Sequence, residues 1–187
     1  MKTKFAALLA LTVTPSLALA HPGHEHHSFS AGITHPVTGF DHLIMLLAFG
    51  LLVGCVAAGN SKKVALITGG IASLICGLFA GQVFGFSTLV EPAIIASLFV
   101  VSISLWHAFS PSTTRVNTAI AASVGMLFFH GYAHGVEAAG NVSLFAAGML
   151  ISAALLMVAG SVTGYFVRSK WMSVGVASAS ALLLMAA

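Results

Sequence analysis

The chain has 187 residues, of which 58% are hydrophobic and 6% are charged, and its mean hydropathy is +1.04. These values exclude an ordinary soluble domain and indicate a chain that lies in a lipid bilayer. The net charge of +3 does not indicate nucleic-acid binding, because the few Lys and Arg residues are scattered between apolar runs and form no basic face.

The N-terminal residues 1–20 have the features of a secretory signal peptide. Lys2 and Lys4 precede the apolar run 5–13, and an Ala-Leu-Ala sequence ends at Ala20. This pattern predicts cleavage after Ala20. The alternative is an uncleaved first membrane helix, but the run is short and Pro15 interrupts it.

Residues 21–34 would then form a polar tail at the start of the mature protein, outside the membrane. The tail contains four histidines within seven residues, namely His21, His24, His26 and His27. Neutral imidazole binds borderline divalent metals, so we interpret the tract as a metal-gathering tail. The alternative is a flexible, solvated terminus without a metal role.

Six apolar segments of spanning length follow, separated by short polar breaks. They predict an all-α membrane protein whose residues 35–187 form a compact six-helix transmembrane bundle, with segments at 39–58, 64–84, 92–110, 118–138, 142–166 and 171–187. Four glycine pairs, each four residues apart, favour close helix packing: Gly50/Gly54, Gly77/Gly81, Gly131/Gly135 and Gly160/Gly164.

The basic residues predict the orientation of the bundle. If the mature N-terminus is outside, then the first, third and fifth loops are cytoplasmic, and they contain Lys62, Lys63, Arg115, Arg168 and Lys170. Cytoplasmic loops are the ones that carry an excess of Lys and Arg. We therefore expect a bacterial inner-membrane protein with both mature termini in the periplasm.

The sequence HPVTGFDH at 35–42 places two imidazoles and a carboxylate at the start of the first segment. Ionisable groups in a membrane segment are costly and indicate a functional site. Asp41 has a structural alternative, since Thr38 and Asp41 have the spacing of a capping box. His35 and His42 would lie about 10 Å apart in one helix, so both bind one ion only if Pro36 and Gly39 break it.

A second group lies in the fourth segment, where His130, His134 and Glu137 share one helix face. Two histidines one turn apart can hold one metal ion, and Glu137 can be a further ligand or orient His134. Histidines satisfied by hydrogen bonds are the structural alternative. We predict that His42 approaches the face of His130 and His134 in the outer half of the bundle.

Two further ionisable residues are less specific. Glu91 precedes Pro92 at the start of the third segment on the outer side. It is a candidate metal ligand, although a carboxylate is expected at a helix N-terminus on dipole grounds alone. His107 is interpreted as an interfacial histidine, with an exit-side ligand as the alternative. Imidazole and carboxylate donors suit Ni, Co, Zn, Cu or Fe, and not Mg or Ca.

At these residues the chain resembles the HupE/UreJ family of hydrogenase and urease accessory membrane proteins. The resemblance rests on HPVTGFDH at 35–42, VEPAIIAS at 90–97 and FHGYAHGVE at 129–137, and it covers essentially the whole mature chain. It implies a nickel or cobalt permease that supplies metal for hydrogenase, urease or cobalt-cofactor assembly. The family pattern carries over to His35, Asp41, His42, His130, His134 and Glu137.

The favoured function is therefore movement of Ni²⁺ or Co²⁺ from periplasm to cytoplasm, with no enzymatic activity. The ion is cargo and no prosthetic group is expected. The partners are membrane lipid, the divalent ion and, indirectly, a hydrogenase or urease maturation system; a homo-oligomer is left open. No phosphate-binding GxxxxGK[ST] sequence is present, so the chain itself does not use ATP. Two alternatives remain, an intramembrane zinc-dependent hydrolase and a metal buffer or sensor.

Overall fold

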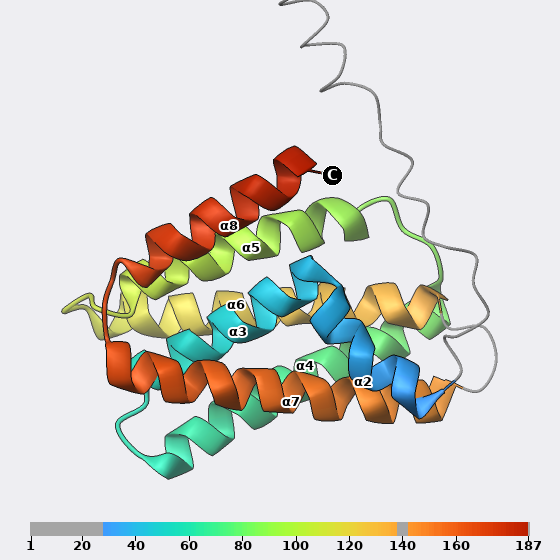
Figure 1. Cartoon of the computed structure of the whole chain (residues 1–187), viewed down its shortest axis with the longest axis horizontal. Helices are drawn as coiled ribbons and strands as arrows, with labels where there is room; N and C mark the ends of the chain where they lie inside the picture. The colour runs from blue at the N-terminus through green and yellow to red at the C-terminus, as the bar shows by residue number, and fades with distance from the viewer. Residues whose placement is uncertain (1–27, 138–141, 187) are drawn as a thin grey trace, which may run out of the picture.

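A computed structural model describes residues 28–137 and 142–186, and every regular element within these ranges is an α-helix (Figure 1). The helices are α2 (Phe29–Thr38), α3 (Phe40–Val56), α4 (Asn60–Phe84), α5 (Val90–His107), α6 (Thr113–Glu137), α7 (Val142–Val167) and α8 (Met172–Ala186). Each of the six predicted segments corresponds to one of the helices α3 to α8. The prediction of an all-α chain is therefore confirmed for the described residues.

The helices differ in how well they fit a membrane. In the described part of the chain, α4, α5, α6 and α7 are each long and apolar enough to cross a bilayer. The helices α2 and α3 meet the same criterion only together, as a bent pair that forms either a broken span or a re-entrant loop. The last helix, α8, is apolar but has 15 residues, a length of about 22 Å against a hydrocarbon core of about 30 Å. The chain is a multi-pass membrane protein in which α8 is shorter than a full span.

The helix α2 was not expected from the sequence. Residues 28–34 were assigned to the polar tail, yet α2 begins at Phe29, and the Ser28 hydroxyl caps it by accepting a hydrogen bond of 3.1 Å from the Ala31 N–H. The helix packs along α7, where a Cβ atom at Gly32 would overlap the carbonyl oxygen of Phe145. Residues 1–27 lie outside the described ranges, and with them the predicted signal peptide and the four tail histidines.

The chain bends by 78° between α2 and α3, at Gly39, whose backbone is extended. Pro36 lies in the last turn of α2, where it removes one backbone N–H from the helix. A side chain at Gly39 would crowd the turn, because its Cβ atom would lie 3.1 Å from Nδ1 of His42. The helix break that would allow both His35 and His42 to bind one ion is therefore present.

The glycine pairs lie where helices pack most closely. Gly50 and Gly54 of α3 face Gly160 and Gly164 of α7, and Gly77 and Gly81 of α4 face Gly131 and Gly135 of α6. A Cβ atom at any of these eight positions would overlap backbone of the facing helix. Small residues let the backbones touch, as expected in a bilayer, where apolar burial gives little drive for association.

Helix α3 is the centre of the packing. It contacts every other described helix, and its buried Met45, Phe49, Leu52 and Val53 belong to the main apolar cluster. The cluster fixes α3 relative to α5, α6 and α7. The start of α3 is thereby held against the last turns of α6.

The start of α4, the start of α6 and the connection between α7 and α8 lie at one end of the bundle, on the left of Figure 1, and these segments carry all the described basic residues. Lys62 and Lys63 are in the first turn of α4, Arg115 is in the first turn of α6, and Arg168 and Lys170 are between α7 and α8. We call this the basic end. The carboxylates of Asp41, Glu91 and Glu137 belong to the opposite ends of α3, α5 and α6.

Replacing Gly77 by Ala should destabilise the bundle by about 1–3 kcal/mol, because the new methyl group would overlap the carbonyl oxygen of Phe128. Gly69→Ala on the same helix is the matched control, since its Cβ would meet nothing within 4 Å and alanine favours helix by up to about 1 kcal/mol. Unfolding of both variants in one detergent checks this. Equal stability of the two variants would contradict the proposed packing.

Candidate metal centre

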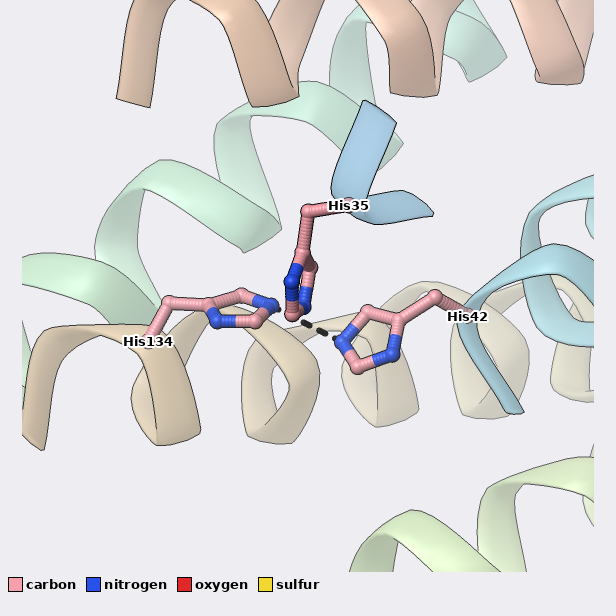
Figure 2. A group of neighbouring side chains, drawn as sticks. All are labelled: His35, His42 and His134. Carbon is pink, nitrogen blue, oxygen red and sulfur yellow. Dashed lines mark hydrogen bonds between the residues drawn. The ribbon is translucent and has the colours of Figure 1, made fainter. Parts of the chain in front are cut away.

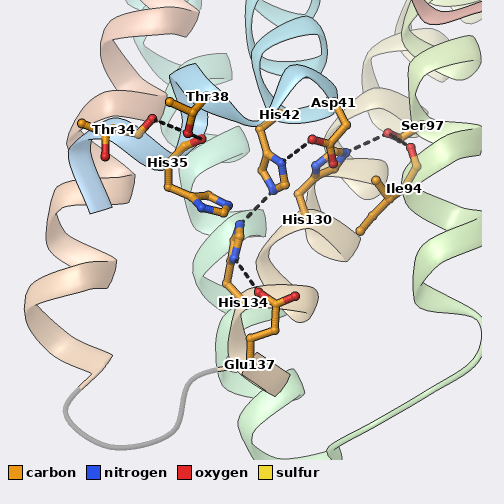
Figure 3. Close-up of polar contacts among 10 residues, drawn as sticks. All are labelled: Thr34, His35, Thr38, Asp41, His42, Ile94, Ser97, His130, His134 and Glu137. Carbon is orange, nitrogen blue, oxygen red and sulfur yellow. Dashed lines mark hydrogen bonds and ion pairs between the residues drawn. The ribbon is translucent and has the colours of Figure 1, made fainter. Parts of the chain in front are cut away.

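Histidines from three helices converge near the bend between α2 and α3. His35 comes from α2, His42 from α3, and His130 and His134 from α6 (Figures 2 and 3). The ring centroids of His35 and His134 are 4.5 Å apart, and those of His42 and His130 are 4.9 Å apart. The predicted approach of His42 to the α6 histidines is confirmed.

Two groups of potential metal ligands lie side by side in the described structure. The first consists of His35, His42 and His134, and the second consists of Asp41, His42 and His130; within each, the donor atoms lie within 4.8 Å of one another. His42 belongs to both. We call them the outer trio and the inner trio, because His130 is one helical turn nearer the basic end than His134, about 6 Å along α6.

The closest contact in the outer trio joins Nε2 of His42 to Nε2 of His134 at 2.8 Å (Figure 2). Without a metal ion, one of these nitrogens must donate a hydrogen to the other. Two ligands about 2.1 Å from one ion at a right angle would be about 3 Å apart. An ion between them would need little movement of the rings and would replace the shared proton.

A carboxylate lies on the far side of each of these two rings. Nδ1 of His42 is 2.9 Å from Oδ1 of Asp41, and Nδ1 of His134 is 3.6 Å from Oε2 of Glu137 (Figure 3). A carboxylate that accepts a hydrogen from one ring nitrogen turns the lone pair of the other toward a metal. Asp41 thus orients the Nε2 atom of His42 toward His134, while Glu137 lies at ion-pair distance from the ring of His134.

The ring of His130 is oriented by a serine of α5. The Ser97 hydroxyl donates to the carbonyl oxygen of Ile94 at 2.6 Å, and its oxygen is 2.8 Å from Nε2 of His130. Because the single hydroxyl hydrogen is used for Ile94, Nε2 of His130 is the donor to Ser97. The lone pair of His130 is then on Nδ1 and is available to an ion in the inner trio.

Three of the four histidines of the centre are buried, and one of its two acids is exposed. His42, His130 and His134 have 8%, 2% and 4% of their surface exposed, whereas the side chain of Glu137 is 54% exposed. Burying several imidazoles together within a span is costly unless they bind something in common. Glu137 is thus an acid at the surface, beside the buried ring of His134.

Two expectations about individual residues change. Thr38 and Asp41 do not form a capping box: the N-cap of α3 is Gly39, without a side-chain bond, and the Thr38 hydroxyl donates to Thr34 and His35 carbonyls. The Asp41 carboxylate contacts the ring of His42 instead. Glu91 is exposed in the first turn of α5 and belongs to neither trio of the described structure.

The chain is similar to known proteins of one family. A family model described as "HupE / UreJ protein" matches residues 9–187. The chain is also similar to "Protein HupE" of Rhizobium leguminosarum bv. viciae, with 28% identity over 162 residues, which cover 84% of this chain and 81% of that protein. No solved structure matches the chain.

Replacing Ser97 by Ala should weaken metal binding by about 10- to 100-fold, because His130 loses the group that fixes its ring. The matched control is Ser104→Ala, which removes a buried hydroxyl two turns along α5 that donates to the Ala119 carbonyl at 3.1 Å. Calorimetric titration with Ni²⁺ and Co²⁺, on protein lacking residues 21–27, measures the affinities. Equal losses in both variants would contradict a positioning role for Ser97.

Proposed function

The chain belongs to the HupE/UreJ family, and on this premise we propose that it is a permease that moves nickel or cobalt ions into the cytoplasm for metalloenzyme maturation. Proteins of this family have accessory and transport roles associated with nickel and cobalt. The observation that carries the proposal is the pair of ligand trios that share His42 within the helical bundle.

Because the two trios share His42, the centre favours passage of a metal ion over its storage. A permease must bind its ion well enough to strip water from it and weakly enough to release it, so several incomplete sites serve better than one closed cage. Each trio supplies three ligands from the described residues, fewer than the four of a closed structural site. An ion held in the outer trio can move to the inner trio while His42 keeps hold of it.

The route we propose begins at the two acids of the centre. Glu137 and Asp41 attract the hydrated cation, the outer trio replaces part of its water, and His130 receives it one turn closer to the basic end. The histidines of residues 21–27 would gather the ion before this step. The signal peptide, cleavage after Ala20 and the periplasmic location of both mature termini are parts of the same proposal.

The basic end supports the proposed orientation. It carries all five Lys and Arg residues of the described ranges, and the positive-inside rule assigns such an end to the cytoplasm. A divalent cation entering from the periplasm would then move down the membrane potential, which contributes about 4.6 kcal/mol per ion at about 100 mV. No ATP hydrolysis by this chain is required.

The donors support a transition metal as cargo. Imidazole nitrogen with a small share of carboxylate oxygen suits nickel or cobalt better than magnesium or calcium. We propose nickel first, with cobalt as a second substrate, because of the family association. A hydrogenase or urease maturation system would be the indirect client, and the chain would hold no prosthetic group.

The comparisons lend no support to the alternative of an intramembrane zinc-dependent hydrolase. That reaction would need an ion kept in place with a water-filled position and an acid acting as base. Here the two acids closest to the rings, Asp41 and Glu137, face the Nδ1 atoms of His42 and His134.

Cells that express the protein under metal limitation should accumulate more nickel, and His42→Ala and His134→Ala should each abolish the increase. His107→Ala is the control, because His107 ends α5 and lies at the basic end. Cell-associated Ni, Co, Zn, Cu, Mn and Fe are measured by mass spectrometry, with membrane protein levels checked by immunoblot. An unchanged content of every metal would refute the permease; uptake unaffected by both substitutions would refute this site.

Deletion of residues 21–27 should lower uptake mainly at low nickel, because a tail that gathers ions matters only when ions are scarce. Initial rates over a range of nickel concentrations should show a higher KM with a similar maximal rate. Loss of transport at saturating nickel would contradict a gathering role for the tail.

A further inference from the structure

A groove lies between α5 and α6 near the basic end, away from the metal centre. Its cavity has a volume of about 350 Å³, and its walls are formed by the last turns of α5 and the first turns of α6. Neither trio contributes a residue to it. The proposed transport route therefore leaves this groove without a role.

One part of the groove is apolar and faces outward. Val100 and Ile103 of α5 and Ala119 and Ala122 of α6 line it, and Ile103 is 57% exposed. Since both helices are candidate spans, an exposed apolar side chain on them faces lipid. The two alanines leave a channel along the helix pair that suits an acyl chain.

The other part of the groove is polar and carries a positive charge. Thr114 and Arg115 in the first turn of α6 line it, as does His107 at the end of α5. The two described ion pairs both lie in the metal centre, and neither includes Arg115. The first turn of α6 adds the positive end of a helix dipole, which favours an anion.

Neighbouring side chains place this polar part at the level of lipid headgroups. Trp106 and Trp171 pack edge to face with ring centroids 6.1 Å apart, and Nζ of Lys170 lies 4.9 Å from the Trp106 ring centroid. Trp and Lys residues of this kind are typical of the membrane–water interface. A phosphate at Arg115 would therefore have its acyl chains at the depth of Ile103.

We propose that the groove binds one anionic phospholipid, with the phosphate at Arg115 and the first turn of α6 and an acyl chain along Val100, Ile103 and Ala122. The positive charge of Arg115 disfavours a divalent cation in the groove. The lipid would brace α5 against α6 and so support Ser97 and His130, which these two helices contribute. The proposal does not depend on metal transport.

The test uses full-length mature protein stripped of lipid in a neutral detergent. Phosphatidylglycerol and phosphatidylcholine with identical chains are titrated separately, and bound lipid is counted by native mass spectrometry while the unfolding temperature is recorded. Phosphatidylglycerol should bind one molecule tightly and raise the unfolding temperature more than phosphatidylcholine does. Arg115→Gln should lower its affinity by about tenfold.

Lys62→Gln is the matched control, because it removes an exposed charge from the basic end at a residue that does not line the groove. The Lys62→Gln variant should still bind one phosphatidylglycerol molecule tightly. Ala122→Phe, which fills the apolar part, should no longer bind phosphatidylglycerol tightly. In the unsubstituted protein, glycerol 3-phosphate alone should not displace the bound lipid. Equal binding of the two lipids, equal losses in Arg115→Gln and Lys62→Gln, or full competition by glycerol 3-phosphate would each overturn the proposal. Nickel binding by the same samples reports separately on the metal centre.

Discussion

The contact between Nε2 of His42 and Nε2 of His134 is the interaction on which the arrangement of this protein depends. Buried imidazoles within a span must satisfy one another or a shared ion, and here His42 of α3 and His134 of α6 do so at 2.8 Å. The bend at Gly39 brings His35 of α2 beside the same pair, with its ring centroid 5.1 Å from that of His42 and 4.5 Å from that of His134. The glycine contacts between α3 and α7 and between α4 and α6 set the backbone spacing of the helix pairs that carry these rings.

Much of the fold could be predicted from the sequence, because the length of an apolar run indicates whether it can span the bilayer. Apolar run length predicts the six segments, and glycine spacing predicts close helix packing; a helix occurs at each segment and the glycines lie at helix contacts. The helix α2 was missed because its 10 residues are too few to span a membrane alone, and it packs along α7. Helix α6 begins at Thr113, five residues before the predicted segment at 118, because hydropathy marks the apolar stretch and not the helix start.

The site could be predicted in part. The approach of His42 to His130 and His134 could be predicted. The two α6 histidines share one helix face, all three lie on the same side of the membrane, and ionisable groups in a span have few purely structural uses. The contact of Ser97 with His130 was not predicted, because nothing in the sequence pairs this serine with a particular histidine; its signal is its position in VEPAIIAS at 90–97. Thr38 and Asp41 have capping-box spacing, but spacing cannot show that His42 competes for the same carboxylate. The position of Glu91 in the first turn of α5 is explained by the favourable interaction of a carboxylate with the helix dipole.

X-ray absorption at the nickel edge, on Ni²⁺-loaded protein that lacks residues 21–27, tests the central claim most directly. We expect nitrogen and oxygen ligands at about 2.1 Å with the outer-shell scattering of about three imidazoles. His42→Ala should remove most of the imidazole signal, because both trios lose their common ligand. A spectrum of oxygen ligands alone, or an imidazole signal unchanged in His42→Ala, would contradict the account.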